Sequence, residues 1–102
     1  PCPAGSGRDK IVENAFGHDL LTLMNGFRPE LILISAGFDS RIGDPLGQFR
    51  LVDEDFTSLT GIVLDLAKEY ADGKVVSVLE GGYDLNGLGK ASVSHARKLL
   101  SI

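Results

Sequence analysis

The sequence has one cysteine, no tryptophan and two histidines among its 102 residues. The single cysteine, Cys2, cannot form an internal disulfide and cannot by itself build a thiolate metal site. There is no basic excess, with 10 basic against 14 acidic side chains and a net charge of -4, which argues against a nucleic-acid-binding module. The longest apolar run, residues 31–34, is far shorter than the roughly 20 residues that cross a bilayer, and no signal segment opens the chain. We therefore expect a cytoplasmic globular protein without a nucleic-acid or membrane partner.

The composition is typical of a folded chain, because 43% of the residues are hydrophobic and 24% are charged. The length allows at most one domain of about 100 residues. The chain begins with Pro1 rather than methionine, so we expect that a segment upstream is missing.

Apolar residues recur at steps of three and four in three stretches, which predicts three helices. The first begins at Arg8 and ends near Gly26, the second is capped by Asp53, and the third is capped by Asn86. The expected apolar faces are Ile11, Ala15, Phe16, Leu20, Leu23 and Phe27 in the first helix, Phe56, Leu59, Val63, Leu66, Ala67 and Tyr70 in the second, and Leu85, Leu88, Ala96, Leu99 and Leu100 in the third.

Two short continuous apolar runs, residues 31–35 and 75–79, predict strands that are covered on both faces. A helix between two such strands predicts a right-handed βαβ unit in a parallel sheet. Because two strands make a very small sheet, we expect the chain to be one part of a larger α/β domain. A compact small domain with an extra strand hidden in a loop is the alternative.

Ligands of open α/β sheets bind beyond the carboxyl ends of the strands, where residues 35–47 and 80–84 form the loops. Carboxylates bind zinc together with histidine, and a phenol can donate a hydrogen bond to an oxyanion. Spacing alone leaves two interpretations open, because an aspartate in a Gly-Pro loop also caps turns and a tyrosine after Gly-Gly also packs on its neighbours. The polar groups of these loops are Asp39, Asp44, Glu80, Asp84 and Tyr83.

Three motifs carry a resemblance to a known family. They are SAGFD at 35–39, GDPLG at 43–47 and LEGGYD at 79–84. With them the chain resembles the histone deacetylase superfamily, and more narrowly its class II and bacterial branch, which includes acetylpolyamine amidohydrolases. The resemblance implies an α/β fold with a parallel sheet in a three-layer αβα arrangement, arginase/deacetylase-like, of which residues 1–102 would be the C-terminal portion.

The resemblance also implies roles for single residues. Asp44 matches a zinc ligand of the family, so Zn(2+) is the implied cofactor. Tyr83 matches the tyrosine that hydrogen-bonds the substrate carbonyl and then the oxyanion. Gly81 and Gly82 fall where the family's backbone lines the acyl-lysine tunnel, and Asp39 is expected to brace the loop rather than to bind metal.

The Asp-x-His and His-His motifs of that family do not occur here. His18 and His95 each stand alone in a predicted helix, and we interpret them as a surface histidine and a packed neutral imidazole. The resemblance therefore implies a zinc-dependent deacetylase that acts on acetyl-lysine or an acetylpolyamine and needs the upstream remainder of its catalytic domain. We expect the chain alone to be inactive.

A different class of function stays open at this point. The loops beyond the strands could belong to a non-catalytic α/β module that binds a partner. A sheet edge left open by a cut domain would also favour self-association into a homo-oligomer.

Overall fold

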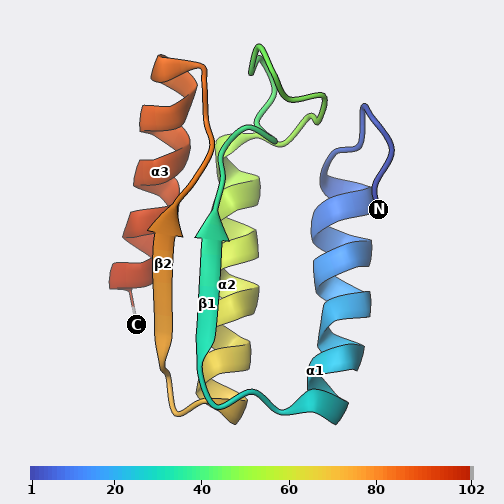
Figure 1. Cartoon of the computed structure of the whole chain (residues 1–102), viewed down its shortest axis with the longest axis vertical. Helices are drawn as coiled ribbons and strands as arrows, with labels where there is room; N and C mark the ends of the chain where they lie inside the picture. Colours follow the sequence, from blue (N-terminus) through green and yellow to red (C-terminus); the bar gives the residue numbers. More distant parts are fainter. Residues whose placement is uncertain (102) are drawn as a thin grey trace.

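The computed structural model describes residues 1–101 as a βαβ unit flanked by two further helical segments (Figure 1). The two strands pair in parallel, with Ile32 opposite Val75 and Ala36 opposite Leu79. Among the described residues, no helix has the length and apolarity to cross a bilayer. In chain order the elements are η1 (Asp9–Leu20), α1 (Leu21–Phe27), β1 (Ile32–Ala36), α2 (Asp53–Tyr70), β2 (Val75–Leu79) and α3 (Leu85–Leu100).

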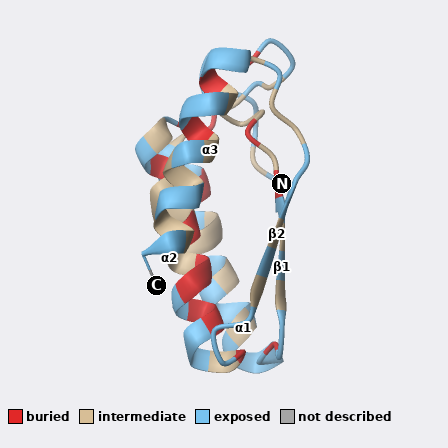
Figure 2. Cartoon of the chain, turned by 90° about the vertical axis from the view of Figure 1, so that its left-hand side faces the viewer, coloured by how far each residue is buried: buried red, intermediate tan, exposed pale blue. Residues whose placement is uncertain are grey.

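All the helices lie on one face of the sheet, and the other face is bare (Figure 2). The side chains of Leu33, Val76 and Val78 point to the bare face and are 69%, 49% and 54% exposed. The prediction that both strands are covered on both faces is therefore wrong for this chain. The chain holds two of the three layers that an αβα arrangement needs.

The alternative of a hidden extra strand is also wrong for residues 1–101. The sheet has two strands, and the long loop between β1 and α2 adds only an isolated bridge between Arg41 and Leu51.

The first helix lies where it was predicted, but its first twelve residues are a π-helix rather than an α-helix. A Cβ atom on Gly17 would lie 2.9 Å from the carbonyl oxygen of Val12, five residues earlier, so the absent side chain suits the wider turn. A stripe spaced for 3.6 residues per turn rotates away from the core in such a helix. Consequently Val12 is buried, while the predicted face residues Leu23 and Phe27 are 66% and 73% exposed.

The two later helices begin differently from the prediction. Asp53 is the first residue of α2 rather than its cap, because the carboxylate of Asp55 accepts the backbone N–H of Val52 at 2.9 Å. In α3 the N-cap position belongs to Asp84 instead of Asn86.

Helix α2 buries most of the predicted face, with Leu59 and Tyr70 half-buried, and α3 does not bury its predicted face. Leu85 and Leu100 are more than 80% exposed, and Ala96 is also exposed. The small residues Gly87 and Ala91 are buried instead, and α3 packs closely against α2. The main core cluster consists of Ile11, Val12, Ala36, Phe38, Leu51, Phe56 and Ala91.

Candidate functional site

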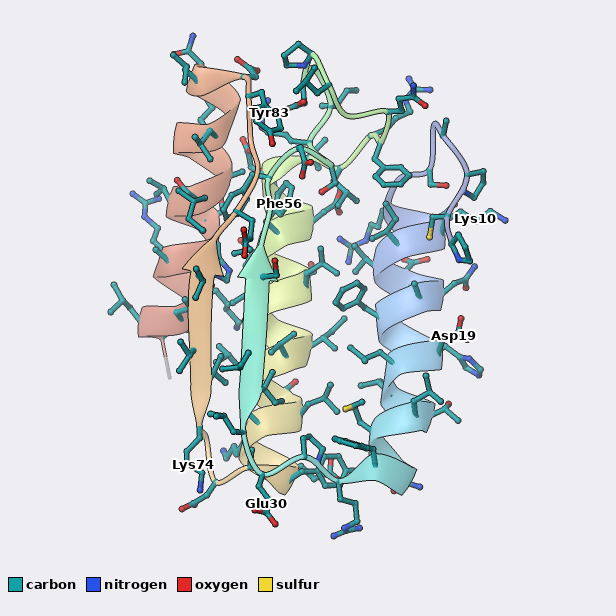
Figure 3. All side chains as sticks on the ribbon, viewed as in Figure 1. Lys10, Asp19, Glu30, Phe56, Lys74 and Tyr83 are labelled. Atoms are coloured by element: carbon teal, nitrogen blue, oxygen red, sulfur yellow. The ribbon has the colours of Figure 1, made fainter. Side chains whose placement is uncertain are left out.

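The loops that follow β1 and β2 meet at one rim of the sheet through the carboxylate of Asp44. Its Oδ1 accepts the backbone N–H groups of Leu46 and Gly47, both at 2.8 Å. Its Oδ2 accepts the backbone N–H of Tyr83, also at 2.8 Å. Parallel pairing places both strand ends on this rim, and Figure 3 shows Tyr83 beyond the arrowheads of the strands. The prediction that the two loops converge is confirmed.

Asp44 as a whole residue is only 9% exposed, but its surroundings favour the charged form of its carboxylate. Burial alone raises the pKa of a carboxyl group, and this effect is the largest single one at Asp44. The backbone N–H groups of Tyr83, Gly47, Leu46 and Asp84 together outweigh it, so the pKa of Asp44 lies below its ordinary value. A buried negative charge is therefore held at the rim at neutral pH.

This carboxylate fits zinc as one ligand. A carboxylate offers about four lone-pair positions, and the three short hydrogen bonds occupy two on Oδ1 and one on Oδ2. The backbone N–H of Asp84 also acts on this carboxylate, so Oδ2, which accepts only one of the short hydrogen bonds, is the oxygen better placed to meet a cation. Within residues 1–101, no group of three or more His, Cys, Asp or Glu side chains could hold a metal ion. Asp44 therefore suits a single place in a larger ligand set.

The two glycines before Tyr83 are needed for close approach. Gly82 has a φ of 136°, and a Cβ atom there would lie 2.8 Å from Cδ1 of Leu88. A Cβ atom on Gly81 would lie 3.0 Å from Cγ of Asp39. The carbonyl of Gly81 also accepts the backbone N–H of Phe38 at 2.8 Å. The segment is thus pressed against the end of β1.

The side chain of Tyr83 is free to meet a ligand, because the residue is 51% exposed while its backbone is fixed by Asp44. Asp39 lies against Gly81 and Gly37, which agrees with a bracing position. The catalytic role of Tyr83, the substrate contacts of Gly81 and Gly82 and the metal role of Asp44 stay predictions.

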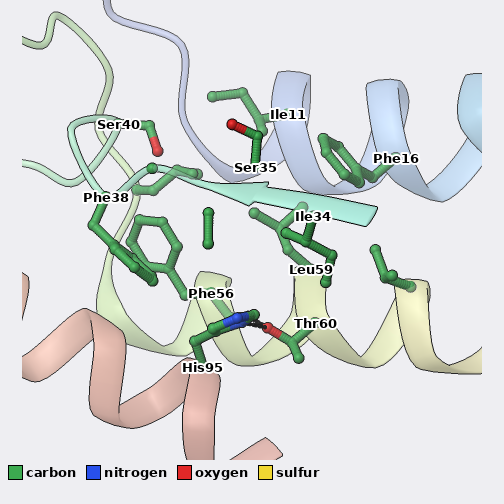
Figure 4. A pocket seen from close by; sticks show the side chains of 14 residues that line it. Ile11, Phe16, Ile34, Ser35, Phe38, Ser40, Phe56, Leu59, Thr60 and His95 are labelled. Carbon is green, nitrogen blue, oxygen red and sulfur yellow. Dashed lines mark hydrogen bonds between the residues drawn. The ribbon is translucent and has the colours of Figure 1, made fainter. Parts of the chain in front are cut away.

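The two histidines have the environments expected from the sequence. His18 is exposed, with Nδ1 3.1 Å from Oδ1 of Asp19. His95 lies at a largely apolar cavity of about 190 Å³ between β1 and the helices (Figure 4). Burial lowers the pKa of His95, which favours the neutral imidazole.

The hydrogen bonds around His95 fix its tautomer. The hydroxyl of Thr60 donates its only proton to the carbonyl of Phe56 at 2.6 Å. Thr60 Oγ1 must therefore accept a hydrogen bond from the protonated Nδ1 of His95, at 2.7 Å. Nε2 of His95 then carries no proton and accepts a hydrogen bond from the hydroxyl of Ser77 at 2.8 Å. The imidazole joins α2, β2 and α3 behind the rim.

Comparison with known proteins identifies the family. The family profile of the histone deacetylase domain matches residues 1–99. The chain belongs to the histone deacetylase family. It is 45% identical over 86 residues to the "Polyamine deacetylase HDAC10" of Danio rerio, covering 84% of the chain and 12% of that protein.

Two further relatives bring out the fold and the extent of the match. The "Histone deacetylase-like amidohydrolase" of Pseudomonas aeruginosa is 37% identical over 83 residues, which are 81% of this chain and 22% of that protein. The solved structure of the histone deacetylase Clr3 matches with a TM-score of 0.83 and 35% identity, over 98% of this chain and 16% of that chain. The predicted deacetylase-like α/β fold is confirmed. The chain spans less than a quarter of the length of each of these three relatives.

Replacing Gly82 with alanine should destabilise the protein. The new methyl group would meet Leu88 at a backbone φ of 136°, which costs about 1–3 kcal/mol. Gly26 is the matched control, because a Cβ atom there meets nothing within 4 Å and its α-helical site favours alanine. Urea unfolding should show a loss for Gly82→Ala and none for Gly26→Ala. Equal midpoints would contradict the close packing of the segment.

The stability of the protein should fall in mild acid because of His95. Its pKa is lowered in the folded protein, so the unfolded protein binds the proton first as the pH falls. The contribution of His95 to the free energy of unfolding is fully present above about pH 6.5, the usual pKa of histidine. It is lost as the pH falls from there through the lower pKa that His95 has in the folded protein.

Urea unfolding at a series of pH values measures this effect. His95→Gln should flatten the pH dependence, whereas His18→Gln, which changes only an exposed side chain, should keep it. Identical pH profiles for His95→Gln and the unmodified protein would refute the assignment.

Proposed function

We propose that these residues belong to a zinc-dependent deacetylase that hydrolyses the amide bond of an acetylated amine, either acetyl-lysine or an acetylated polyamine. The observation that carries the proposal is the hydrogen bond from the backbone N–H of Tyr83 to Oδ2 of Asp44. It brings a buried anionic ligand and an exposed phenol to one rim. Membership of the histone deacetylase family supports the broader assignment to deacetylases and amidohydrolases.

In this proposal each residue has a distinct task. A zinc ion held at this rim would supply a Lewis acid that polarises the amide carbonyl and lowers the pKa of bound water toward neutrality. Asp44 would be one of the residues that hold this ion, through its carboxylate. Tyr83 donates its phenolic proton in a hydrogen bond to the carbonyl oxygen as negative charge develops there. The backbone of Gly81 and Gly82 lines the path of the acetylated side chain.

The rest of the site must lie outside these residues. A catalytic zinc site takes three protein ligands, and the described part of the chain offers Asp44 alone. We therefore propose that further ligands and the general base come from another part of the catalytic domain, upstream in the sequence. The bare apolar face of the sheet agrees with packing against such a part.

Tyr83→Phe in the intact protein should lower kcat by about 10²–10³, which is the typical loss on removing one oxyanion donor. Zinc content should stay unchanged, since the backbone N–H that binds Asp44 remains. Tyr70→Phe is the matched control, because Tyr70 lies at the far end of α2. Undiminished turnover in Tyr83→Phe would remove the phenol from the mechanism.

Asp44→Ala should lose zinc, because it removes both the negative charge and the carboxylate oxygens that would bind the ion. Asp39→Asn should keep it, since Asp39 is assigned no ligand role. Metal analysis of the purified proteins distinguishes these outcomes, and circular dichroism checks that both variants fold. Full zinc occupancy in folded Asp44→Ala protein would contradict the ligand assignment.

Residues 1–102 alone should show no deacetylase activity, because one carboxylate cannot complete a three-ligand site. The assay uses an acetyl-lysine peptide and an acetylated polyamine with added zinc. Turnover by the isolated chain would show that the remaining groups need not come from elsewhere. Lack of zinc and of turnover in the intact protein would instead favour a non-catalytic binding module.

A further inference from the structure

The guanidinium of Arg41 occupies a place beside the rim that no part of the proposed mechanism uses. Its Nε donates to Oδ1 of Asp53 at 2.7 Å, and its Nη2 donates to Oδ2 of the same carboxylate at 3.2 Å. Its Nη1 donates to the carbonyl of Ile42 at 3.3 Å and lies 3.9 Å from Oδ2 of Asp84. The Arg41 side chain is only 17% exposed, so one cation contacts three segments of chain.

Arg41 stands at the neck of the loop that carries Asp44. The backbone N–H of Ile42 donates to the carbonyl of Leu51 at 2.7 Å, and the N–H of Leu51 donates to the carbonyl of Ser40 at 3.1 Å. These bonds close the loop on either side of Asp44, whose own N–H donates to the carbonyl of Arg41 at 3.2 Å. The position of Asp44 therefore depends on where residue 41 is anchored.

The first turn of α3 is shaped to admit this guanidinium. A Cβ atom on Gly87 would lie 2.8 Å from Nη1 of Arg41 and 2.8 Å from Oδ2 of Asp84. A side chain at residue 87 would make the cation or the carboxylate shift, whereas glycine leaves this space to both. Arg41 thus reaches the segment that follows Tyr83 as well as the start of α2.

The contacts of Arg41 are unequal in strength. The pair with Asp53 is bidentate and short, a geometry that strengthens charge-assisted hydrogen bonds. The Arg41 bond lowers the pKa of Asp53 more than burial raises it. The contact with Asp84 is longer, and that carboxylate is 37% exposed, so solvent screens it. The anchoring of Arg41 to α2 through Asp53 is therefore the stronger of the two contacts.

We propose that Arg41 is a positioning residue that holds the Asp44 loop against α2 and the Tyr83 segment. Through this clamp it fixes the Asp44 carboxylate in the geometry that a metal ion requires. The consequence for zinc rests on the proposed function, whereas the clamp itself does not.

The experiment compares Arg41→Gln and Arg41→Lys with Arg8→Gln in the intact protein. Arg8 is a matched control, because its Nη1 donates at 2.7 Å to Asp55, also in the first turn of α2. The clamp is measured by native-state hydrogen exchange at the three backbone N–H groups that bind the Asp44 carboxylate. Zinc affinity is measured by competition with a chelator.

Arg41→Gln should speed exchange at Leu46, Gly47 and Tyr83 by about tenfold relative to the core of α2, as expected for a lost charge-assisted bond. It should also weaken zinc binding about 10- to 100-fold, the usual effect of losing a residue that orients a ligand. Arg41→Lys should give exchange rates and a zinc affinity between those of Arg41→Gln and the unmodified protein, since lysine keeps the charge without the bidentate geometry. Arg8→Gln should leave the exchange rates and the zinc affinity within about twofold, because Arg8 contacts Asp55, Ser58 and Glu13 rather than the Asp44 loop or the Tyr83 segment.

Equal exchange at these N–H groups in Arg41→Gln and Arg8→Gln would overturn the clamp. Faster exchange with unchanged zinc affinity would overturn its role toward the metal. If the unmodified protein binds no zinc, the proposed function fails, and the exchange data still decide the clamp. If Arg41→Gln does not fold, Asp53→Asn removes the charge of the partner at nearly constant shape, and the same comparison decides.

Discussion

Parallel pairing of β1 and β2 is the constraint on which the candidate site depends. The register runs from Ile32 opposite Val75 to Ala36 opposite Leu79, so both strands end at the same level. The loops that follow them must then share one rim. The buried charge of Asp44 and its bond to the N–H of Tyr83 turn this proximity into a fixed connection. Every residue proposed for chemistry lies at that connection.

Much of the fold and the meeting of the two loops could be predicted from the sequence. The run 75–79 is continuous, apolar and bounded by turn residues, and it is the strand β2 without a shift of either end. The convergence of Asp44 with Tyr83 follows from the rule that parallel strands present their carboxyl ends together. Which face of the sheet is covered could not be predicted as well. A continuous apolar strand has the same sequence pattern whether the segment that packs on it lies within these residues or elsewhere.

Other features leave no trace in local patterns. Arg41 and Asp53 are twelve residues apart, across a loop without periodicity, so no spacing rule pairs them. The Thr60–His95–Ser77 network joins three elements, and only their packing brings those side chains together. The π-helical hydrogen bonding of η1 likewise departs from apolar spacing that suits an ordinary α-helix. These features depend on tertiary contacts rather than on neighbours in the chain.

The hydrogen bonding of Asp44 has a consequence for isosteric replacement. Three backbone N–H groups point at its two oxygens, from both sides. An asparagine at this position would have nearly the same shape, but its NH₂ group would face an N–H donor on whichever side it was placed. Such a change would set donor against donor and loosen the rim before any ion is considered. A carboxylate is therefore required here by the backbone itself, and metal binding would be a second use of a charge that the loop already needs.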